Sequence, residues 1–224
     1  MRSFRVLSRL LTYPQAKLFA HMDEMKAVLV DEKVLKGRKL KAVTGFMDEL
    51  SATELITAQE TYVELFDRGR SHCLHLFEHV HGESHFRGQA MIELAARYED
   101  KGLTIGAAEL PDYLPLFLEF VSICEPKEAQ ATLSQAAPVI ATIGEKLKRR
   151  ESGYATVMEA IVALSGVRLS RLDIKRAADA AMPDIQTLDD LDKEWAEPEA
   201  FDGSPDCGTC GENELPALQQ IKGA

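Results

Sequence analysis

Apolar residues recur at helical spacing along most of this 224-residue chain, and this periodicity limits the fold more than any other feature. Tyr154, Val157, Met158 and Ile161 lie three or four positions apart, as on one face of a helix, and similar faces recur from Phe4 to about residue 180. The sequence has no alternating run of β-branched and aromatic residues bounded by turns. It therefore predicts an all-α fold, with residues 1–181 as one helical-bundle domain.

Local signals suggest where some of these helices begin and bend. Ser51 followed by Glu54 has the form of a capping box and predicts a helix start. Pro111 suits the first position of another helix, because proline fixes φ and needs no amide partner there. Pro138 falls inside a longer helical stretch, from Lys127 to about Arg150, and predicts a bend or a break.

The charge of the chain is concentrated at its C-terminal end. The formal net charge is −10, and residues 182–224 hold eleven acidic and two basic residues. Prolines are scattered there and apolar residues are sparse, so we expect a largely irregular, acidic tail. Acidic proteins lack the basic patch that nucleic acids and anionic membranes require, so neither is an expected partner.

Membrane insertion and export are not expected either. The longest stretch without charge, residues 129–144, contains glutamine, serine and proline and is too short to span a bilayer. Arg5 and Arg9 interrupt the segment that would be the apolar part of a signal peptide. The sequence thus predicts a cytoplasmic protein.

Histidines cluster in one segment, which raises the possibility of a zinc enzyme. Five of the six histidines fall between His72 and His85, and His75, Glu78 and His79 form an H-x-x-E-H pattern. Two histidines four positions apart on a helix can share zinc, with the glutamate as base. A zinc-dependent hydrolase is therefore one alternative. The other is a helix whose histidines make hydrogen bonds or line a groove.

A Cys207-x-x-Cys210 pair in the tail offers a second alternative, a metal-binding accessory subunit. The pair is half of a zinc-ribbon knuckle without its second half, so both residues are only weak metal candidates. Phosphate-binding loops and a nucleophile elbow are missing from the sequence, and nothing assembles a catalytic triad. The sequence therefore favours a binding protein over an enzyme, with no cofactor of its own.

Three runs of residues strongly resemble the NarJ family, the assembly chaperones of respiratory nitrate reductase within the wider TorD/DmsD-type group. The first run is Glu64-Leu-Phe-Asp67-Arg68-Gly-Arg. The second covers residues 76–91 and includes Leu76-Phe-Glu78-His79-Val-His81-Gly-Glu83 and Arg87-Gly-Gln-Ala-Met91. The third begins with Glu109-Leu-Pro-Asp112-Tyr113 and continues to Phe120. Tyr113 stands where the wider group often has histidine, so no imidazole role carries over there.

The resemblance implies a function and its partners. A NarJ-type chaperone binds the apo catalytic (alpha) subunit of the membrane-bound nitrate reductase, including its N-terminal leader-like segment. It holds that subunit competent for insertion of bis-molybdopterin guanine dinucleotide. The implied partners are that subunit and the proteins of molybdenum cofactor biosynthesis.

A basic amphipathic leader would bind as a helix in an apolar groove. The expected contact residues are Tyr62, Phe66, Asp67, Arg68, Phe77, Glu78, His79, His81, Glu83, Arg87, Met91, Asp112, Tyr113 and Phe117. The aromatic residues and Met91 would be anchors, and the carboxylates, with Glu64, would form an acidic rim. Taken singly, an aromatic residue at helical spacing belongs to the core more often than to a groove, and Asp67, Arg68 and Arg87 suit an internal ion network equally.

Overall fold

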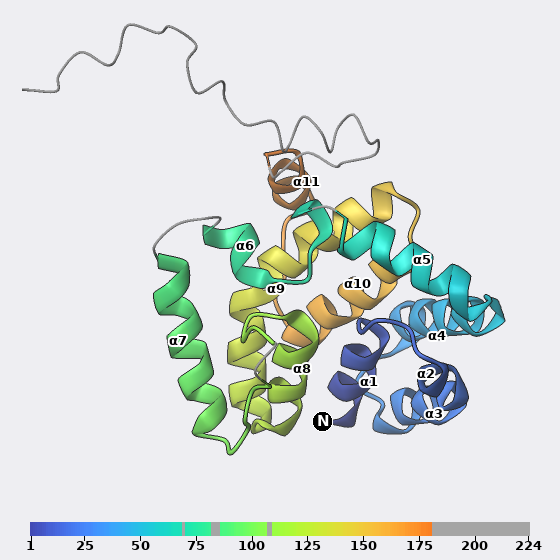
Figure 1. Ribbon diagram of the computed structural model, residues 1–224, viewed down its shortest axis with the longest axis horizontal. Coiled ribbons are helices and arrows are strands. Elements are labelled where there is room, and N and C mark those ends of the chain that lie inside the picture. The colour runs from blue at the N-terminus through green and yellow to red at the C-terminus, as the bar shows by residue number, and fades with distance from the viewer. Residues whose placement is uncertain (69, 82–85, 107–108, 181–224) are drawn as a thin grey trace, which may run out of the picture. The chain divides into compact units, whose positions relative to one another are not determined.

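The computed structural model describes residues 1–68, 70–81, 86–106 and 109–180 (Figure 1). Within these ranges the chain forms α-helices, one 3₁₀ turn and no strand, which confirms the all-α prediction. The elements are α1 Arg2–Leu10, α2 Ala16–Ala20, α3 Met22–Glu32, α4 Gly37–Ala52, α5 Leu55–Phe66, η1 Arg70–His72, α6 Leu76–His81, α7 Phe86–Glu99, α8 Leu114–Ile123, α9 Pro126–Arg149, α10 Tyr154–Ser165 and α11 Arg171–Ala180. The expected tail, 182–224, lies outside the described residues.

The longest helix, α9, forms the centre of this domain (Figure 1). Its buried face carries Leu133, Ile140, Ile143 and Leu147, all fully buried. Helices α6, α8, α10 and α11 pack against it, and α10 makes the most extensive pair. The two helices approach closely at Gly144, where an added Cβ would lie 2.9 Å from the Cβ of Met158. The predicted core periodicity of these segments is thus present in the fold.

Helix α1, near the start of the sequence, packs against its neighbour α3 and against the distant helix α8. Its apolar face, with Phe4 and Leu7, is buried, and Ser8 Oγ donates a hydrogen bond of 2.8 Å to the Pro115 carbonyl in α8. The carboxylate of Glu32, at the end of α3, accepts hydrogen bonds of 2.7 Å from the backbone N–H groups of Arg2 and Ser3. Because these N–H groups have no partner within their own helix, Glu32 supplies a cap from a distant element.

Two of the predicted helix starts are wrong, and α9 does not break at Pro138. The Pro138 side chain lies on the exposed face, and the packing of four helices on α9 outweighs a proline cost of about 3 kcal/mol. Ser51 is inside α4 and donates to the Met47 carbonyl at 2.7 Å, so it does not cap α5. Pro111 precedes α8 by several residues, and Pro115 occupies the first turn instead.

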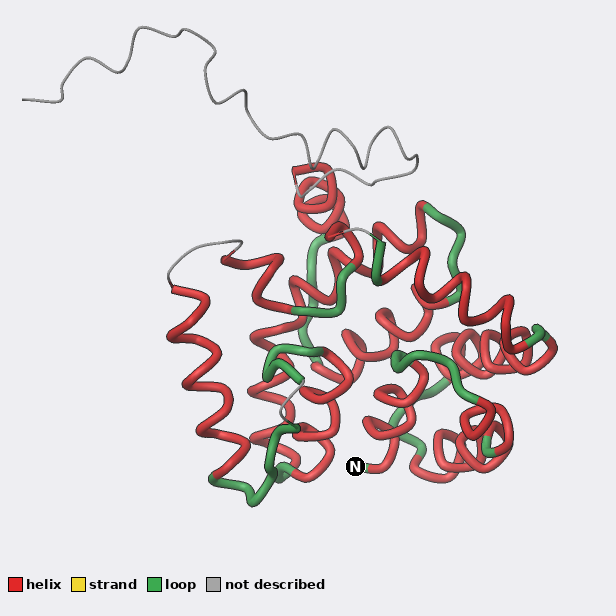
Figure 2. The backbone as a smooth tube through the Cα atoms, in the orientation of Figure 1, coloured by secondary structure: helices red, strands yellow, loops and turns green. Residues whose placement is uncertain are grey.

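The irregular segments before α6 and α8 run beside each other, joined by an antiparallel bridge between His75 and Tyr113 (Figure 2). This pairing holds the starts of α6 and α8 next to each other. In the part of the chain that the structure describes, no helix combines the length and apolar character needed to cross a membrane.

Candidate functional site

The buried carboxylate of Asp112 fixes the start of α6. Its Oδ2 accepts a hydrogen bond of 3.0 Å from the Phe77 N–H, and its Oδ1 lies 3.3 Å from Nδ1 of His75. The backbone adds two bonds, from Leu76 N–H to the Asp112 carbonyl at 3.0 Å and from Leu114 N–H to the Leu74 carbonyl at 2.8 Å. Asp112 thus positions α6 against α8 instead of presenting its charge to solvent.

A second polar cluster connects α6 to η1 and α7. The Cys73 thiol donates to Oε2 of Glu78 at 3.1 Å, and Arg87 in α7 donates to the other carboxylate oxygen at 3.1 Å. Burial, aided by the nearby Glu78 carboxylate, raises the pKa of the Cys73 thiol to about 12. Burial alone would raise the pKa of Glu78, but the thiol and the Arg87 guanidinium together lower it. Glu78 is therefore an ionised, fully occupied carboxylate.

His79 is held in the same cluster by the backbone. Its Nε2 donates to the Cys73 carbonyl at 2.9 Å, and burial lowers the pKa of the imidazole. His75, by contrast, faces Asp112 and stacks near the Tyr113 ring, with centroids 5.4 Å apart. The two histidines therefore have different partners and do not converge on a common point.

Phe77, whose N–H donates to Asp112, also lines an apolar cavity of about 320 Å³ between α6, α7, α8 and α9. Its lining is mostly apolar and comes from all four helices: Leu76, Phe77, Val80, Ala90, Leu94, Phe117, Ala136 and Val139. Arg97 at its edge is held by a 2.7 Å hydrogen bond to Thr132 and lies over the Phe120 ring at 5.6 Å. We refer to this cavity, lined by α6, α7, α8 and α9, as the α6–α9 cavity.

Exposed large apolar side chains occur on α6 and α7. Val80, which lines the cavity, is 54% exposed, and α7 carries Phe86 and Ile92, 71% and 65% exposed, outside the lining. Single exposed apolar residues are ordinary, but an apolar cavity with an exposed apolar residue in its lining is typical of a site that binds another chain. The α6–α9 cavity is therefore the candidate site for a protein partner.

The structure places the expected contact residues in three groups. Phe77, Glu78, His79, Arg87, Met91 and Tyr113 are partly buried, and Asp67 and Arg68 are exposed on the turn after α5. Glu83 and the side chain of His81 lie outside the described residues, as do Cys207 and Cys210. The third group is buried: Tyr62 is 3% exposed, Phe66 5%, Phe117 4% and Asp112 0%.

The four buried residues make their contacts within the fold, and their direct contact with a partner stays a prediction. The Tyr62 hydroxyl donates to the Leu11 carbonyl at 2.8 Å, and its ring lies 4.9 Å from that of Phe66 in an aromatic core cluster with Tyr154. Asp112 is occupied within the fold, as described above. Phe117 forms part of the inner wall of the α6–α9 cavity. Arg87 pairs with Glu78 at 3.1 Å, and the alternative of an internal ion network with Asp67 and Arg68 stays a prediction.

The exposed Phe86 and Ile92 were not predicted from the sequence. They lie off the α7 face that carries the buried Leu94 and Tyr98, and apolar residues outside the single apolar stripe of a helix are a signal that could have found them. Among the described residues, no group of three His, Cys, Asp or Glu side chains could hold a metal ion. The ligands required by the zinc alternative, His75 and His79, are thus not brought together.

Comparisons with known proteins agree with this picture. A family model described as "Nitrate reductase delta subunit" matches residues 31–159, a range that includes the whole lining of the α6–α9 cavity. The chain is 39% identical over 216 residues to "Nitrate reductase molybdenum cofactor assembly chaperone NarJ" of Escherichia coli (strain K12), covering 96% of this chain and 90% of that protein.

Two further relatives extend the comparison. "Probable nitrate reductase molybdenum cofactor assembly chaperone NarW" of Escherichia coli (strain K12) is 36% identical, over 88% of this chain and 82% of that protein. The NarJ protein of Bacillus subtilis (strain 168) is 27% identical, over 80% of this chain and 95% of its own length. The resemblance found in the sequence is thereby confirmed, and the chain belongs to the nitrate reductase delta subunit family.

Proposed function

We propose that this protein is a system-specific chaperone that binds the apo catalytic subunit of a respiratory nitrate reductase in the cytoplasm. It holds that subunit competent to receive its molybdenum cofactor and catalyses no reaction itself. Family membership supports this role, because the relatives named above are molybdenum cofactor assembly chaperones of nitrate reductase.

The α6–α9 cavity is the proposed binding site for the N-terminal segment of the catalytic subunit. The apolar lining of this cavity is the observation that supports this part of the proposal. An amphipathic helix that docks in a groove inserts apolar anchors spaced three or four residues apart. The cavity offers apolar walls from four helices, and the exposed Val80 extends its apolar lining to the surface. The structure supports apolar anchoring as the main source of affinity.

The charge distribution supports a smaller electrostatic contribution than an acidic rim would give. Glu64 already pairs with Arg150 at 3.0 Å, Glu78 with Arg87 at 3.1 Å, and Asp112 is buried. A basic peptide would have to displace these internal partners to gain the same carboxylates. We therefore expect affinity for the peptide to fall only modestly, by less than about tenfold, between 50 and 500 mM salt.

Filling the cavity tests this site. Ala136, in α9, lines the cavity, whereas Ala131 in the same helix is exposed and outside it. Isothermal titration calorimetry with a peptide from the N-terminus of the catalytic subunit should show saturable binding to the wild-type chain. Ala136→Trp should abolish or weaken binding at least about tenfold, because an indole occupies the space that the peptide needs.

Ala131→Trp is the matched control and should bind the peptide like the wild type. Equal binding by both variants would contradict the cavity as the peptide site. A pull-down of the tagged chain from cells grown anaerobically on nitrate tests the wider proposal. It should recover the catalytic subunit, and with it any cofactor biosynthesis protein in the same complex. Failure to recover that subunit would contradict the chaperone role.

A further inference from the structure

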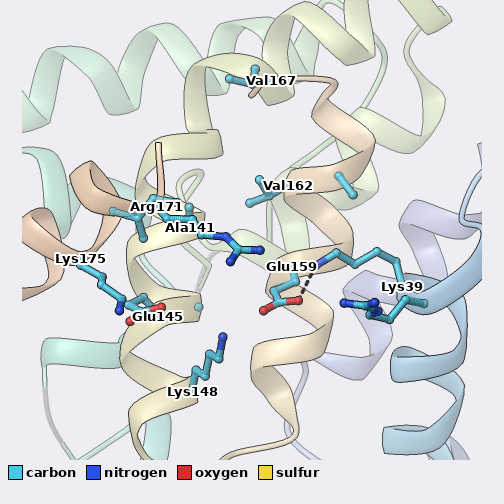
Figure 3. A pocket seen from close by; sticks show the side chains of 13 residues that line it. Lys39, Ala141, Glu145, Lys148, Glu159, Val162, Val167, Arg171 and Lys175 are labelled. Atoms are coloured by element: carbon cyan, nitrogen blue, oxygen red, sulfur yellow. Dashed lines mark hydrogen bonds and ion pairs between the residues drawn. The ribbon is translucent and has the colours of Figure 1, made fainter. Parts of the chain in front are cut away.

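A second, larger cavity lies between α4, α9, α10 and α11, on residues that the proposed peptide site does not use (Figure 3). Its volume is about 620 Å³, within the usual range for small-molecule sites. Five of its lining side chains are cationic, namely Arg38, Lys39, Lys148, Arg171 and Lys175, and two are anionic, Glu145 and Glu159. A chain of net charge −10 thus contains a cavity of net charge +3.

Both carboxylates of this basic cavity already have cationic partners. Glu159 forms an ion pair with Lys39, drawn as a dashed line in Figure 3, and Glu145 lies 3.8 Å from Arg149. Neither is therefore available to neutralise the rest of the lining. In the part of the chain that the structure describes, the other four cations have no ion-pair partner.

The four remaining cations come from three helices and border one space. Figure 3 shows the side chains of Lys148, from α9, and Arg171, from α11, pointing toward the gap between α9 and α10. Arg38 approaches from α4 and Lys175 from the next turn of α11. Like charges gathered around a partly enclosed space repel one another, and an anion of matching charge relieves that repulsion.

The walls between the cations are apolar. They include Ala141 of α9, Val162 of α10 and Ile174 of α11, together with Gly144, which lacks a side chain. A bare inorganic anion would leave these walls uncovered. The lining therefore suits a ligand with a multiply charged group and a flat or apolar body.

We propose that this basic cavity binds a small organic anion that carries a diphosphate group, of the size of a nucleoside diphosphate. Arginine forms two parallel hydrogen bonds to a phosphate, and lysine supplies a point charge, so Arg38 and Arg171 with Lys148 and Lys175 fit two adjacent phosphates. A monocarboxylate would neutralise only one of the four cations. The apolar walls would contact the base or another ring.

Isothermal titration calorimetry on the full chain tests the proposal with adenosine diphosphate, inorganic pyrophosphate and adenosine as probes. Adenosine diphosphate should bind best, pyrophosphate more weakly because it leaves the walls uncovered, and adenosine least. Affinity for both phosphate probes should fall steeply as salt rises. The measurement needs no nitrate reductase subunit, so its result is independent of the chaperone proposal.

Variants locate the site. The double variant Lys148→Gln/Arg171→Gln should weaken adenosine diphosphate binding at least about tenfold, since it removes two of the four cations that would pair with the phosphates. Lys127→Gln/Arg176→Gln is the matched control, because these exposed residues lie on the same two helices outside the cavity. All four side chains are exposed, so both variants should fold, which circular dichroism verifies.

Three results would overturn the proposal. The first is no heat of binding with millimolar adenosine diphosphate or pyrophosphate. The second is equal loss of affinity in the cavity variant and in the control variant. The third is binding of an oligoglutamate peptide in the absence of diphosphate binding, which would assign the basic cavity to an acidic protein segment.

Discussion

Removing the Asp112 carboxylate should destabilise α6 more than the rest of the domain. Asp112→Ala leaves the Phe77 N–H, now 3.0 Å from Oδ2, without its acceptor, at about 1–3 kcal/mol. It also removes the partner of His75, whose side chain is 31% exposed, so that contact adds at most about 1 kcal/mol. The expected loss in free energy of unfolding is about 1–4 kcal/mol.

Urea denaturation followed by circular dichroism measures this loss, and the thermal midpoint should fall by about 2–4 °C per kcal/mol for a domain of this size. Asp112→Asn keeps an oxygen that accepts from Phe77 N–H, so we expect it to cost about 1 kcal/mol. Asp100→Ala, on an exposed residue, is the control and should change stability by less than about 0.5 kcal/mol.

The same variants connect stability to the proposed site. Because Asp112 positions α6, and α6 supplies Phe77 and Val80 to the α6–α9 cavity, Asp112→Ala should weaken peptide binding at temperatures where the domain remains folded. In the Asp112→Ala variant, backbone amide hydrogens should exchange faster in α6 than in α9 or α10. Asp112→Ala with wild-type stability, or Asp112→Asn as unstable as Asp112→Ala, would refute the positioning role.

Three further predictions concern packing, pH and reactivity. Gly144→Ala should lower the free energy of unfolding by about 1–2 kcal/mol, because the added Cβ would press on Met158. Gly45→Ala, in α4 with open space around the added Cβ, should raise the free energy of unfolding by about 0.5–1 kcal/mol. Thermal denaturation of both variants checks these opposite signs. Burial opposes ionisation of Glu32, but its hydrogen bonds to the start of α1 lower the pKa of this carboxyl below 4.5. The stability that Glu32 contributes is therefore present above that pH and is lost as the pH falls through the lowered pKa. Glu32→Gln should flatten the acid limb of a curve of unfolding free energy against pH, and an unchanged limb would contradict the capping role. Because burial raises the pKa of the Cys73 thiol to about 12, iodoacetamide at pH 7.5 should leave Cys73 unmodified in the native protein and label it in urea, as peptide mass spectrometry can show.

The fold was predictable from the sequence because its signal is local. Leu133, Ile140 and Leu147 repeat with the period of a helix, and a helix with one apolar face must bury it whatever its neighbours are. Helix ends were less predictable, since packing decides them. Pro138 is tolerated in α9 because four other helices hold that helix in place.

The site was only partly predictable, because its chemistry depends on contacts between distant residues. The apolar pattern of α5 does not reveal whether Tyr62 and Phe66 face a core or a groove, since both arrangements use the same spacing. Asp112 reads as a surface carboxylate until the Phe77 N–H, 35 positions away, is placed beside it. The basic cavity joins Arg38 to Arg171, and only the packing of α4 and α11 around α9 and α10 brings them together.

The position of α1 also has a consequence for synthesis on the ribosome. Its buried face is completed by α8 and α10, and the bond from Ser8 to the Pro115 carbonyl spans 107 positions. Helix α3 is synthesised soon after α1 and packs on it, but α1 leaves the ribosome long before α8 and α10, which complete its cover, exist. Contacts between residues so far apart form late and slow folding. The nascent chain must therefore carry part of the apolar face of α1 uncovered through much of its translation, a period in which the assembly chaperone is itself open to aggregation.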